Sequence, residues 1–376
     1  MPKSLFGKNS ASPFAWYWQS QLVLLLAAAG LVLLAVLDRQ LFTLSMQEDG
    51  WAEWATFYCF LIGGLLFAAA AFDQHGWLPR LTALGLAAFC VVVAAEEISW
   101  GQRLVSFQPP EVFLAKNFQQ ELNVHNFLKD REILGIEIET KYLVIVIALA
   151  YGVVAPIMLD LLARVPMAQQ VRTLFPPLSF LPWFLLVAYA EYDYPVSFTG
   201  EAAELYLGLI FLLCSVRCVP RLSRARTAAL PGVAAIVLGV ITPGLLDRIF
   251  ALGSSEKEQQ AKAELAAIVD RFEMESGSQR KLMSRRRVHK RLYTSVMQEY
   301  LKDPAAVTSE PDEKNSEALR QVYYLDPWNN PYWLFYERNG MGILYSFGAN
   351  RRRDSKMRGD IELAGDDVVV TWQEAP

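Results

Sequence analysis

The chain has 376 residues, of which 53% are hydrophobic and 20% charged, with a formal net charge of -4 and a mean hydropathy of +0.21. It is too apolar for an ordinary soluble protein and too polar to lie wholly in a membrane, so two kinds of domain are expected. A negative net charge, without zinc-finger spacing or an RNA-binding aromatic motif, argues against nucleic acid as a partner.

Apolar runs that cross, or nearly cross, a hydrocarbon core of about 30 Å as helices recur along the first 250 residues. They predict spans near Gln19–Leu37, Thr56–Phe72, Leu81–Ala95, Tyr142–Leu159, Phe180–Tyr192, Ala202–Val219 and Leu230–Phe250. Loops rich in Lys and Arg favour the cytoplasm, and a cytoplasmic N-terminus puts most loop cations on that side. The sequence therefore predicts a membrane protein with a cytoplasmic N-terminus and with the residues after Phe250 on the other side of the membrane.

A polar loop, residues 96–140, separates the third and fourth runs and begins and ends at a membrane boundary. Ionisable groups at such a boundary are costly unless they face a protein interior or a wet cavity, so they are candidate functional residues. The predicted topology brings acids at the ends of later spans to the same leaflet. The catalytic candidates are Glu96, Glu97, Arg103 and His125, and the candidate metal ligands are Glu121, His125, Glu191 and Glu201.

Two interpretations of these residues remain open. Glu121 and His125 are four positions apart, so on a helix they would share a face, and carboxylate with imidazole suits zinc, manganese or iron. A divalent metal would then serve an enzyme, with Glu97 as the base. In the other interpretation, cations of the loop, including Arg103, pair with the acids and fix the loop on the helical bundle.

The composition changes after Phe250. Leu265, Ile268, Val269 and Phe272 recur at helical spacing and predict an amphipathic helix, with a second helix from the Gly277 region to about Leu301. The basic run Arg285, Arg286 and Arg287 is a candidate binding site for anionic lipid or glycan, or else a solvated helix face. Alternating runs at Tyr332–Tyr336, Ile343–Phe347 and Val368–Trp372 predict short antiparallel strands.

The stretch from Asp326 to Trp372 contains the motifs DPWNNPY and YSFGA, followed by an acidic DD pair. It resembles the C-terminal region of the major pseudopilins of type II secretion, which read like DPWGNPY, then YSxGADG, then an acidic DDI. Upstream, the chain from Val233 is similar to a pilin's N-terminal helix, with Pro243 in the membrane part and an Ala-rich amphipathic half outside it. The resemblance implies a bacterial inner-membrane protein whose tail is a periplasmic pilin-like α+β domain.

Departures from the pilin pattern set limits on this resemblance. Pilins begin with a prepilin peptidase site and carry a glutamate a few residues into the apolar helix, whereas RLSRARTAALPGVAAIVLG has no such glutamate and follows six spans. We therefore expect a pilin-like domain fused to a membrane bundle and not a subunit that polymerises into a pseudopilus.

In major pseudopilins the acidic C-terminal loop binds calcium through oxygen ligands. The matching positions here are Asn350 and Asp354, with either Asp360 or the pair Asp366 and Asp367. The inserted arginines 351–353 place three positive charges in this loop and argue against calcium.

Together these features predict an all-α membrane bundle of about seven transmembrane helices followed by a small α+β pilin-like domain. The expected divisions are residues 1–229 for the bundle, 230–275 for the last span and its amphipathic continuation, and 276–376 for the α+β domain. The predicted function is a structural or adaptor component of an envelope assembly, with membrane lipid and a protein partner of the tail. The alternative is a metal-dependent membrane enzyme acting on a lipid or lipid-linked substrate at the periplasmic face.

Overall fold

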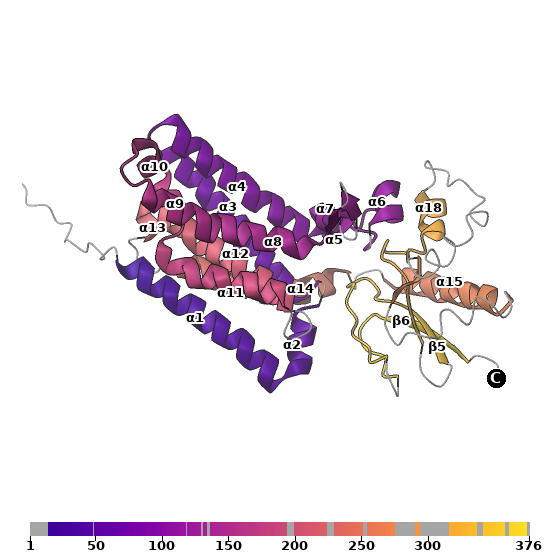
Figure 1. The fold of residues 1–376 in the computed structure, drawn as a ribbon. Coiled ribbons are helices and arrows are strands. Elements are labelled where there is room, and N and C mark those ends of the chain that lie inside the picture. Colours follow the sequence, from indigo (N-terminus) through magenta and orange to yellow (C-terminus); the bar gives the residue numbers. More distant parts are fainter. Residues whose placement is uncertain are drawn as a thin grey trace, which may run out of the picture. The chain divides into compact units, whose positions relative to one another are not determined.

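The computed structural model describes residues 14–47, 49–117, 119–128, 131–133, 136–193, 199–223, 229–250, 254–274, 290–293, 316–336, 341–357 and 361–373. The chain divides into two compact units, each assembled from two separate stretches (Figure 1). Residues 1–98 and 130–243 form the first, here called the membrane unit. Residues 99–129 and 244–376 form the second, here called the loop-tail unit.

Six helical segments of the described chain are long and apolar enough to cross a membrane. They are α1 (Phe14–Leu37), α3 (Trp51–Asp73), α4 (Trp77–Glu97), α8 with its continuation through a π-helical turn, η2, into α9 (Thr140–Leu149, Ala150–Val154 and Ala155–Leu161), α12 (Thr199–Cys218) and α14 (Leu230–Phe250). The prediction of a polytopic membrane protein is confirmed at this level.

A bent helix pair supplies a seventh span if its two halves cross the membrane as one. Pro166–Leu174 contains α10 (Pro166–Val171) and η3 (Arg172–Leu174), and Leu178–Tyr192 contains η4 (Leu178–Phe180) and α11 (Leu181–Tyr192), with a bend of 44° between the halves. Pro176 and Pro177 lie at the break, where proline removes backbone donors and ends a helix. The sequence predicts only the second half, from Phe180, because the prolines interrupt the apolar run.

Helix α12 forms the centre of the membrane unit. Every residue from Leu205 to Val216 is buried, and α12 packs against α3, which in turn packs against α4. Close helix approach depends on small residues. A Cβ at Gly239 of α14 would meet the backbone of Ala55 in α3, and one at Gly152 would collide with the ring of Phe184.

Short elements complete the membrane unit. They are α2 (Arg39–Ser45), the two-stranded antiparallel sheet of β1 (Arg131–Ile133) and β2 (Ile136–Ile138), and α13 (Pro220–Ser223).

The loop-tail unit starts with η1 (Ser99–Gly101), α5 (Gln102–Val105), α6 (Glu111–Lys116) and α7 (Val124–Leu128). It continues with the C-terminal end of α14, then α15 (Ser255–Met274), β3 (Lys290–Arg291), α18 (Ser316–Val322), β4 (Trp333–Tyr336), β5 (Met341–Ser346) and β6 (Val368–Gln373).

The tail pairs α15 with a four-stranded antiparallel sheet in the order β3-β4-β5-β6. The predicted amphipathic helix is confirmed, since Leu265, Ile268 and Val269 of α15 are buried against Leu334 and Leu344 of neighbouring strands. The three predicted strands are confirmed as β4, β5 and β6. Most of the predicted second helix lies outside the described residues, but β3 replaces helix within it because its two residues pair with β4.

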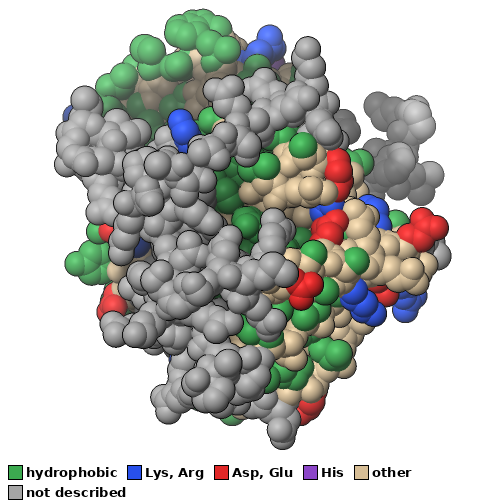
Figure 2. All heavy atoms as spheres, turned by 90° about the vertical axis from the view of Figure 1, so that its right-hand side faces the viewer, with side chains coloured by type: hydrophobic (Ala, Val, Ile, Leu, Met, Phe, Trp, Pro, Cys, Tyr) green, Lys and Arg blue, Asp and Glu red, His purple; other side chains and the backbone are tan. Residues whose placement is uncertain are grey.

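The outer face of α15 is charged and mixed in sign. Glu256, Lys257, Lys262 and Asp270 are exposed on it. Figure 2 shows described acidic and basic side chains interspersed on this side of the molecule. Such a surface lacks a single-sign field that would steer a polyanion.

Candidate functional site

Polar side chains of the 99–129 loop are turned inward and bonded to one another. The Asn117 amide donates to the main-chain oxygens of Glu121 and Asn123 at 2.6 and 3.1 Å. The Ser99 hydroxyl donates to Glu121 Oε2 at 2.6 Å, and the Asn123 amide lies 3.3 Å from the same oxygen. All four residues are buried, so the network forms the interior of the loop.

The predicted metal ligands Glu121 and His125 do not share a helix. Glu121 lies in a bend before α7, which begins at Val124, whereas His125 lies within α7 and is half-buried. The shared helical face predicted from their spacing is therefore wrong, because the helix starts too late. Glu121 instead accepts hydrogen bonds inside the loop, which stabilise its carboxylate.

The predicted catalytic residues come from both units. Glu96 and Glu97 are half-buried at the end of α4 in the membrane unit, whereas His125 belongs to the loop-tail unit. Arg103 lies in α5, but its side chain is outside the described part of the structure. Their action as one catalytic group stays a prediction.

The membrane unit brings acids together, but the group differs from the predicted ligands Glu191 and Glu201. Glu191 of α11 is buried, whereas Glu201, in the first turn of α12, is exposed. Glu204, one turn further along α12, interacts electrostatically with Glu191 and with Glu53 of α3. The sequence analysis does not include Glu53 among the candidate residues. Its position in the first turn of the apolar helix α3 is a signal that could have identified it.

A metal site needs several His, Cys, Asp or Glu side chains close together in space. Among the described residues, no group of three or more such side chains is placed so that it could hold a metal ion. The metal assignments at the membrane boundary therefore stay predictions.

The residues predicted as a calcium loop do lie together in the tail. Asn350 donates its main-chain N–H to Asp366 Oδ2 at 3.0 Å and its amide to Asp354 Oδ2 at 2.7 Å. Asp367 Oδ2 accepts the main-chain N–H groups of Asp354 and Ser355 at 3.0 and 2.6 Å. Burial, with the nearby acids adding to it, raises the pKa of Asp367 to about 7. Protein donors thus hold this cluster together, and calcium binding stays a prediction.

Two of the three arginines expected to repel calcium are bonded to residues outside the acidic loop. Arg351 donates to the main-chain oxygen of Gln102 at 3.1 Å, and Arg352 pairs with Asp247 near the end of α14. Their charges are therefore engaged by other parts of the loop-tail unit. The candidate anion site at residues 285–287, and Asp360, lie outside the described residues.

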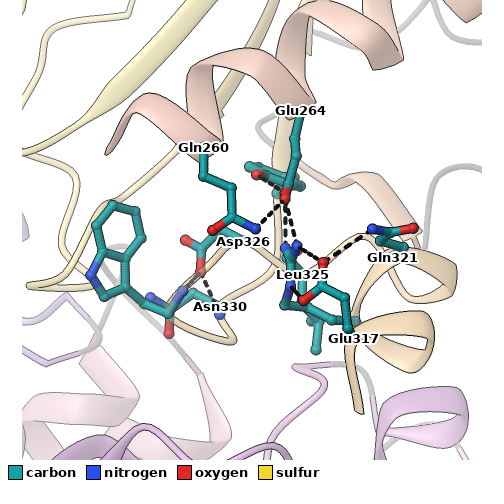
Figure 3. Close-up of polar contacts among 10 residues, drawn as sticks. Gln260, Glu264, Glu317, Gln321, Leu325, Asp326 and Asn330 are labelled. Atoms are coloured by element: carbon teal, nitrogen blue, oxygen red, sulfur yellow. Dashed lines mark hydrogen bonds and ion pairs between the residues drawn. The ribbon is translucent and has the colours of Figure 1, made fainter. Parts of the chain in front are cut away.

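A charge network around the buried Arg320, which the sequence did not reveal, joins α15, α18 and the segment that follows α18 (Figure 3). Arg320 donates to Glu264 in a two-bond fork at 2.8 and 2.5 Å, and to Glu317 at 3.0 and 2.6 Å. It also donates to the main-chain oxygen of Leu325 at 2.7 Å. Tyr332 donates to Glu264 Oε2 at 2.7 Å. Bidentate guanidinium–carboxylate geometry fixes both distance and orientation.

The DPWNNPY motif is organised around Asp326, which is fully buried. Its carboxylate accepts the main-chain N–H groups of Trp328 and Asn330 at 2.9 and 2.8 Å and the Ser346 hydroxyl at 2.5 Å. The Asn330 amide donates to the Gly348 carbonyl at 3.0 Å. Burial raises the pKa of Asp326 to about 6, and the hydrogen bonds oppose that rise. DPWNNPY and YSFGA are thus bonded to each other.

The 99–129 loop is bonded to the tail by side-chain donors. Gln120 donates to the Tyr323 carbonyl at 2.9 Å, and the Tyr323 hydroxyl donates to Glu111 at 2.8 Å. The Asn329 amide donates to the Ser106 carbonyl at 2.8 Å. Residues about 200 positions apart in the sequence therefore form a single folded body.

Apolar packing reinforces these bonds. Leu114 of α6 is fully buried in a cluster with Leu319, Tyr323 and Leu325 of the tail. A buried leucine contributes about 1.5–3 kcal/mol relative to an exposed one. The contact is therefore comparable in strength to several of the hydrogen bonds around it.

The fold defines a class: a polytopic membrane protein with a second compact unit, in which one interhelical loop folds together with helices and a small antiparallel sheet of the tail. Comparison with known proteins goes no further, since no protein-family model, no curated protein and no solved structure matches the chain.

Proposed function

We propose that this protein is a structural or adaptor component of a bacterial envelope assembly, in which the loop-tail unit is the part that meets a partner. The observation that carries the proposal is the bonding of the 99–129 loop to the tail through Gln120, Tyr323 and Asn329. Glu121, the acid of this loop that is a candidate ligand, serves the same architecture because it holds Ser99 and Asn123.

The bonded loop constrains the membrane topology. Segments folded into one extramembrane body lie on one side of the membrane, so an even number of spans must separate residue 98 from the tail. The α8–α9 segment, α12 and α14 make three, and the bent pair Pro166–Tyr192 makes four. This counting supports seven spans, with the bent pair crossing as one.

Orientation follows from the loop cations. With an N-terminus in the cytoplasm, Arg80 in the first turn of α4 and Arg164 between α9 and the bent pair lie at the cytoplasmic side, as the positive-inside rule favours. The loop-tail unit is then periplasmic, and a bacterium with a periplasm is the source that fits.

The tail in this proposal is a pilin-like domain. Support comes from α15 packed on an antiparallel sheet and from the bonding of the two motif segments through Asp326 and Ser346. The machinery proposed for it is a type II secretion-like assembly, on the resemblance of DPWNNPY and YSFGA to the motifs of major pseudopilins. Fused to a bundle, the domain would act at a fixed position in the membrane.

Topology is tested with cysteines introduced at exposed positions and an impermeant maleimide applied to spheroplasts. Val112→Cys in the loop and Leu363→Cys in the tail are expected to react, whereas Ala163→Cys, between α9 and α10, is expected to react only after permeabilisation. Opposite behaviour of positions 112 and 363 would contradict both the seven-span count and a shared body.

Function is tested by complementation in a strain that depends on this protein. Glu97→Gln and His125→Ala are expected to restore growth, because an adaptor needs neither as an acid, base or ligand. Gln120→Ala combined with Asn329→Ala is expected to fail, since it separates loop from tail. The reverse pattern, in which Glu97→Gln fails and the double variant complements, would refute the adaptor.

The second candidate function is a metal-dependent enzyme acting on lipid-linked substrate. The observation that favours it is the buried Glu191 with Glu204 beside it on the next helix. Because no group of three His, Cys, Asp or Glu side chains among the described residues could hold a metal, water or substrate would have to supply the remaining ligands. Elemental analysis of the detergent-purified protein is the test. A transition metal near one per chain, lost in Glu191→Gln and Glu204→Gln, would support the enzyme, and its absence from the parent protein would refute it.

A further inference from the structure

The first residues of the loop have an inverted distribution of polar and apolar side chains. Ser99 and Gln102 are buried, and the Gln102 side chain accepts the Leu122 main-chain N–H at 2.8 Å. Leu104 and Val105 are exposed to 43% and 73%. A segment in water usually buries its apolar side chains and exposes its polar ones. The opposite distribution here indicates that the apolar side chains contact something other than water.

Other parts of the loop repeat the inversion. Asn117, Gln120 and Asn123 are at most 4% exposed, whereas the apolar Val112 and Val124 are more than 40% exposed. The polar interior therefore extends through the loop, and several of its apolar side chains lie outside, although Leu114 is buried against the tail.

The backbone keeps this surface near the end of a membrane span. Glu97 is the last residue of α4, and Ser99, Trp100 and Gly101 follow with φ of 46°, 55° and 87°. Left-handed conformations are unfavourable for Ser and Trp, so this reversal is held by the surrounding contacts. The chain therefore stops extending along the helix axis just after α4 ends, and Val105 follows within eight positions.

We propose that residues 100–105 form a lipid-contact site, with Trp100, Leu104 and Val105 lying at the headgroup–acyl boundary of the leaflet that α4 leaves. The occupant is phospholipid because the surface is continuous in sequence with a membrane span, and because Trp at a span end prefers this interface. Short amphipathic segments lie in this plane with their apolar side toward the acyl chains. Ser99 and Gln102 then face the protein, as observed.

The site has a structural role that goes beyond the proposed adaptor. The same segment gives its Gln102 carbonyl to Arg351 and its Ser106 carbonyl to Asn329 of the tail. A segment held by lipid on one side and by the tail on the other fixes the tail at the membrane surface.

Fluorescence quenching in nanodiscs tests the proposal with the full-length chain. Val105→Cys and Leu104→Cys are labelled with an NBD maleimide and reconstituted in phosphatidylethanolamine and phosphatidylglycerol containing doxyl-labelled phosphatidylcholine. Leu363→Cys, an exposed apolar position in the tail, is the matched control. The four natural cysteines are buried, so the parent chain taken through the same labelling sets the background.

We expect doxyl lipid to quench the label at 104 and 105 at least twice as strongly as at 363, and iodide to quench 363 more strongly. Equal iodide quenching at 105 and 363 would overturn the proposal, because the surface would then face water. Protection of 104 and 105 from both quenchers would also overturn it, because a protein would then cover them.

Discussion

Replacing Arg320 by Met tests whether the charge network around this buried arginine holds the tail together. The arginine side chain is 5% exposed and bonds two carboxylates and a main-chain oxygen. Methionine has a similar length and no donor. The variant therefore leaves Glu264, whose side chain is 22% exposed, with its negative charge in a partly dry site.

The expected cost follows from burial. Removing one partner of a buried ion pair costs about 3–5 kcal/mol, and the partial exposure of Glu264 places the estimate near the lower limit, about 3 kcal/mol. The matched control is Lys356→Met, because Lys356 pairs with Glu362 at 2.6 Å but both side chains are more than half exposed. An exposed pair contributes about 0–1 kcal/mol.

Hydrogen–deuterium exchange of the full-length protein in detergent measures both variants locally. A loss of about 3 kcal/mol corresponds to roughly 150-fold faster exchange through opening of α18 and β4, at 1.36 kcal/mol per factor of ten. Lys356→Met is expected to change these amides by less than about fivefold. If exchange in Arg320→Met matched that of the control, the network would not be a stabilising element and the reasoning from burial would be wrong.

Three further predictions concern packing and pH. Gly239→Leu should lower membrane-unit stability by roughly 3 kcal/mol, because its Cβ meets the Ala55 backbone, while Gly30→Leu, which faces open space, should leave the thermal unfolding midpoint unchanged. The raised pKa of Asp367, about 7 against 3.8, means that stability present at low pH is lost as the pH rises toward 7, by about 2 kcal/mol between pH 5 and 8. Asp367→Asn should flatten this dependence in exchange of β6. Asp326→Asn should speed exchange in β5, because an amide cannot accept all three hydrogen bonds of the carboxylate.

Local patterns in the sequence predict the spans, the amphipathic helix α15 and the strands β4, β5 and β6, but not β3 or the short elements of the loop. Apolar runs predict the spans because hydrocarbon thickness fixes helix length. Alternation predicts β4, β5 and β6 because successive side chains point to opposite faces, and Leu334 and Leu344 do pack against α15. The bent pair Pro166–Tyr192 is the exception. Pro176 and Pro177 interrupt it, so the sequence predicts only its second half as a span.

Long-range pairing was not predictable from these patterns. Gln120 and Tyr323 are 203 positions apart, and neither residue differs in type from an ordinary polar or aromatic surface residue. The position of the loop between two spans predicts that it belongs to the bundle, whereas the structure folds residues 99–129 with the tail.

An acid at a membrane boundary is not always a functional residue, because it can also serve as a hydrogen-bond acceptor inside the fold. Glu121 is ionisable and buried, as a ligand would be, but its oxygens are engaged by Ser99 and Asn123. Sequence alone cannot separate a carboxylate that binds a ligand from one that satisfies neighbouring donors, because both are buried and polar.

The mutual dependence of loop and tail decides how function must be probed. Deleting the tail would remove the acceptor of Gln120 and the donor to Ser106, and would expose Leu114. At about 1 kcal/mol for each hydrogen bond and about 1.5–3 kcal/mol for the leucine, the loop would lose several kcal/mol of support. A deletion would therefore disorder the loop that carries His125, and loss of activity would follow for an adaptor and an enzyme alike. Only point variants that keep the loop folded, such as Glu97→Gln and His125→Ala, separate the two functions.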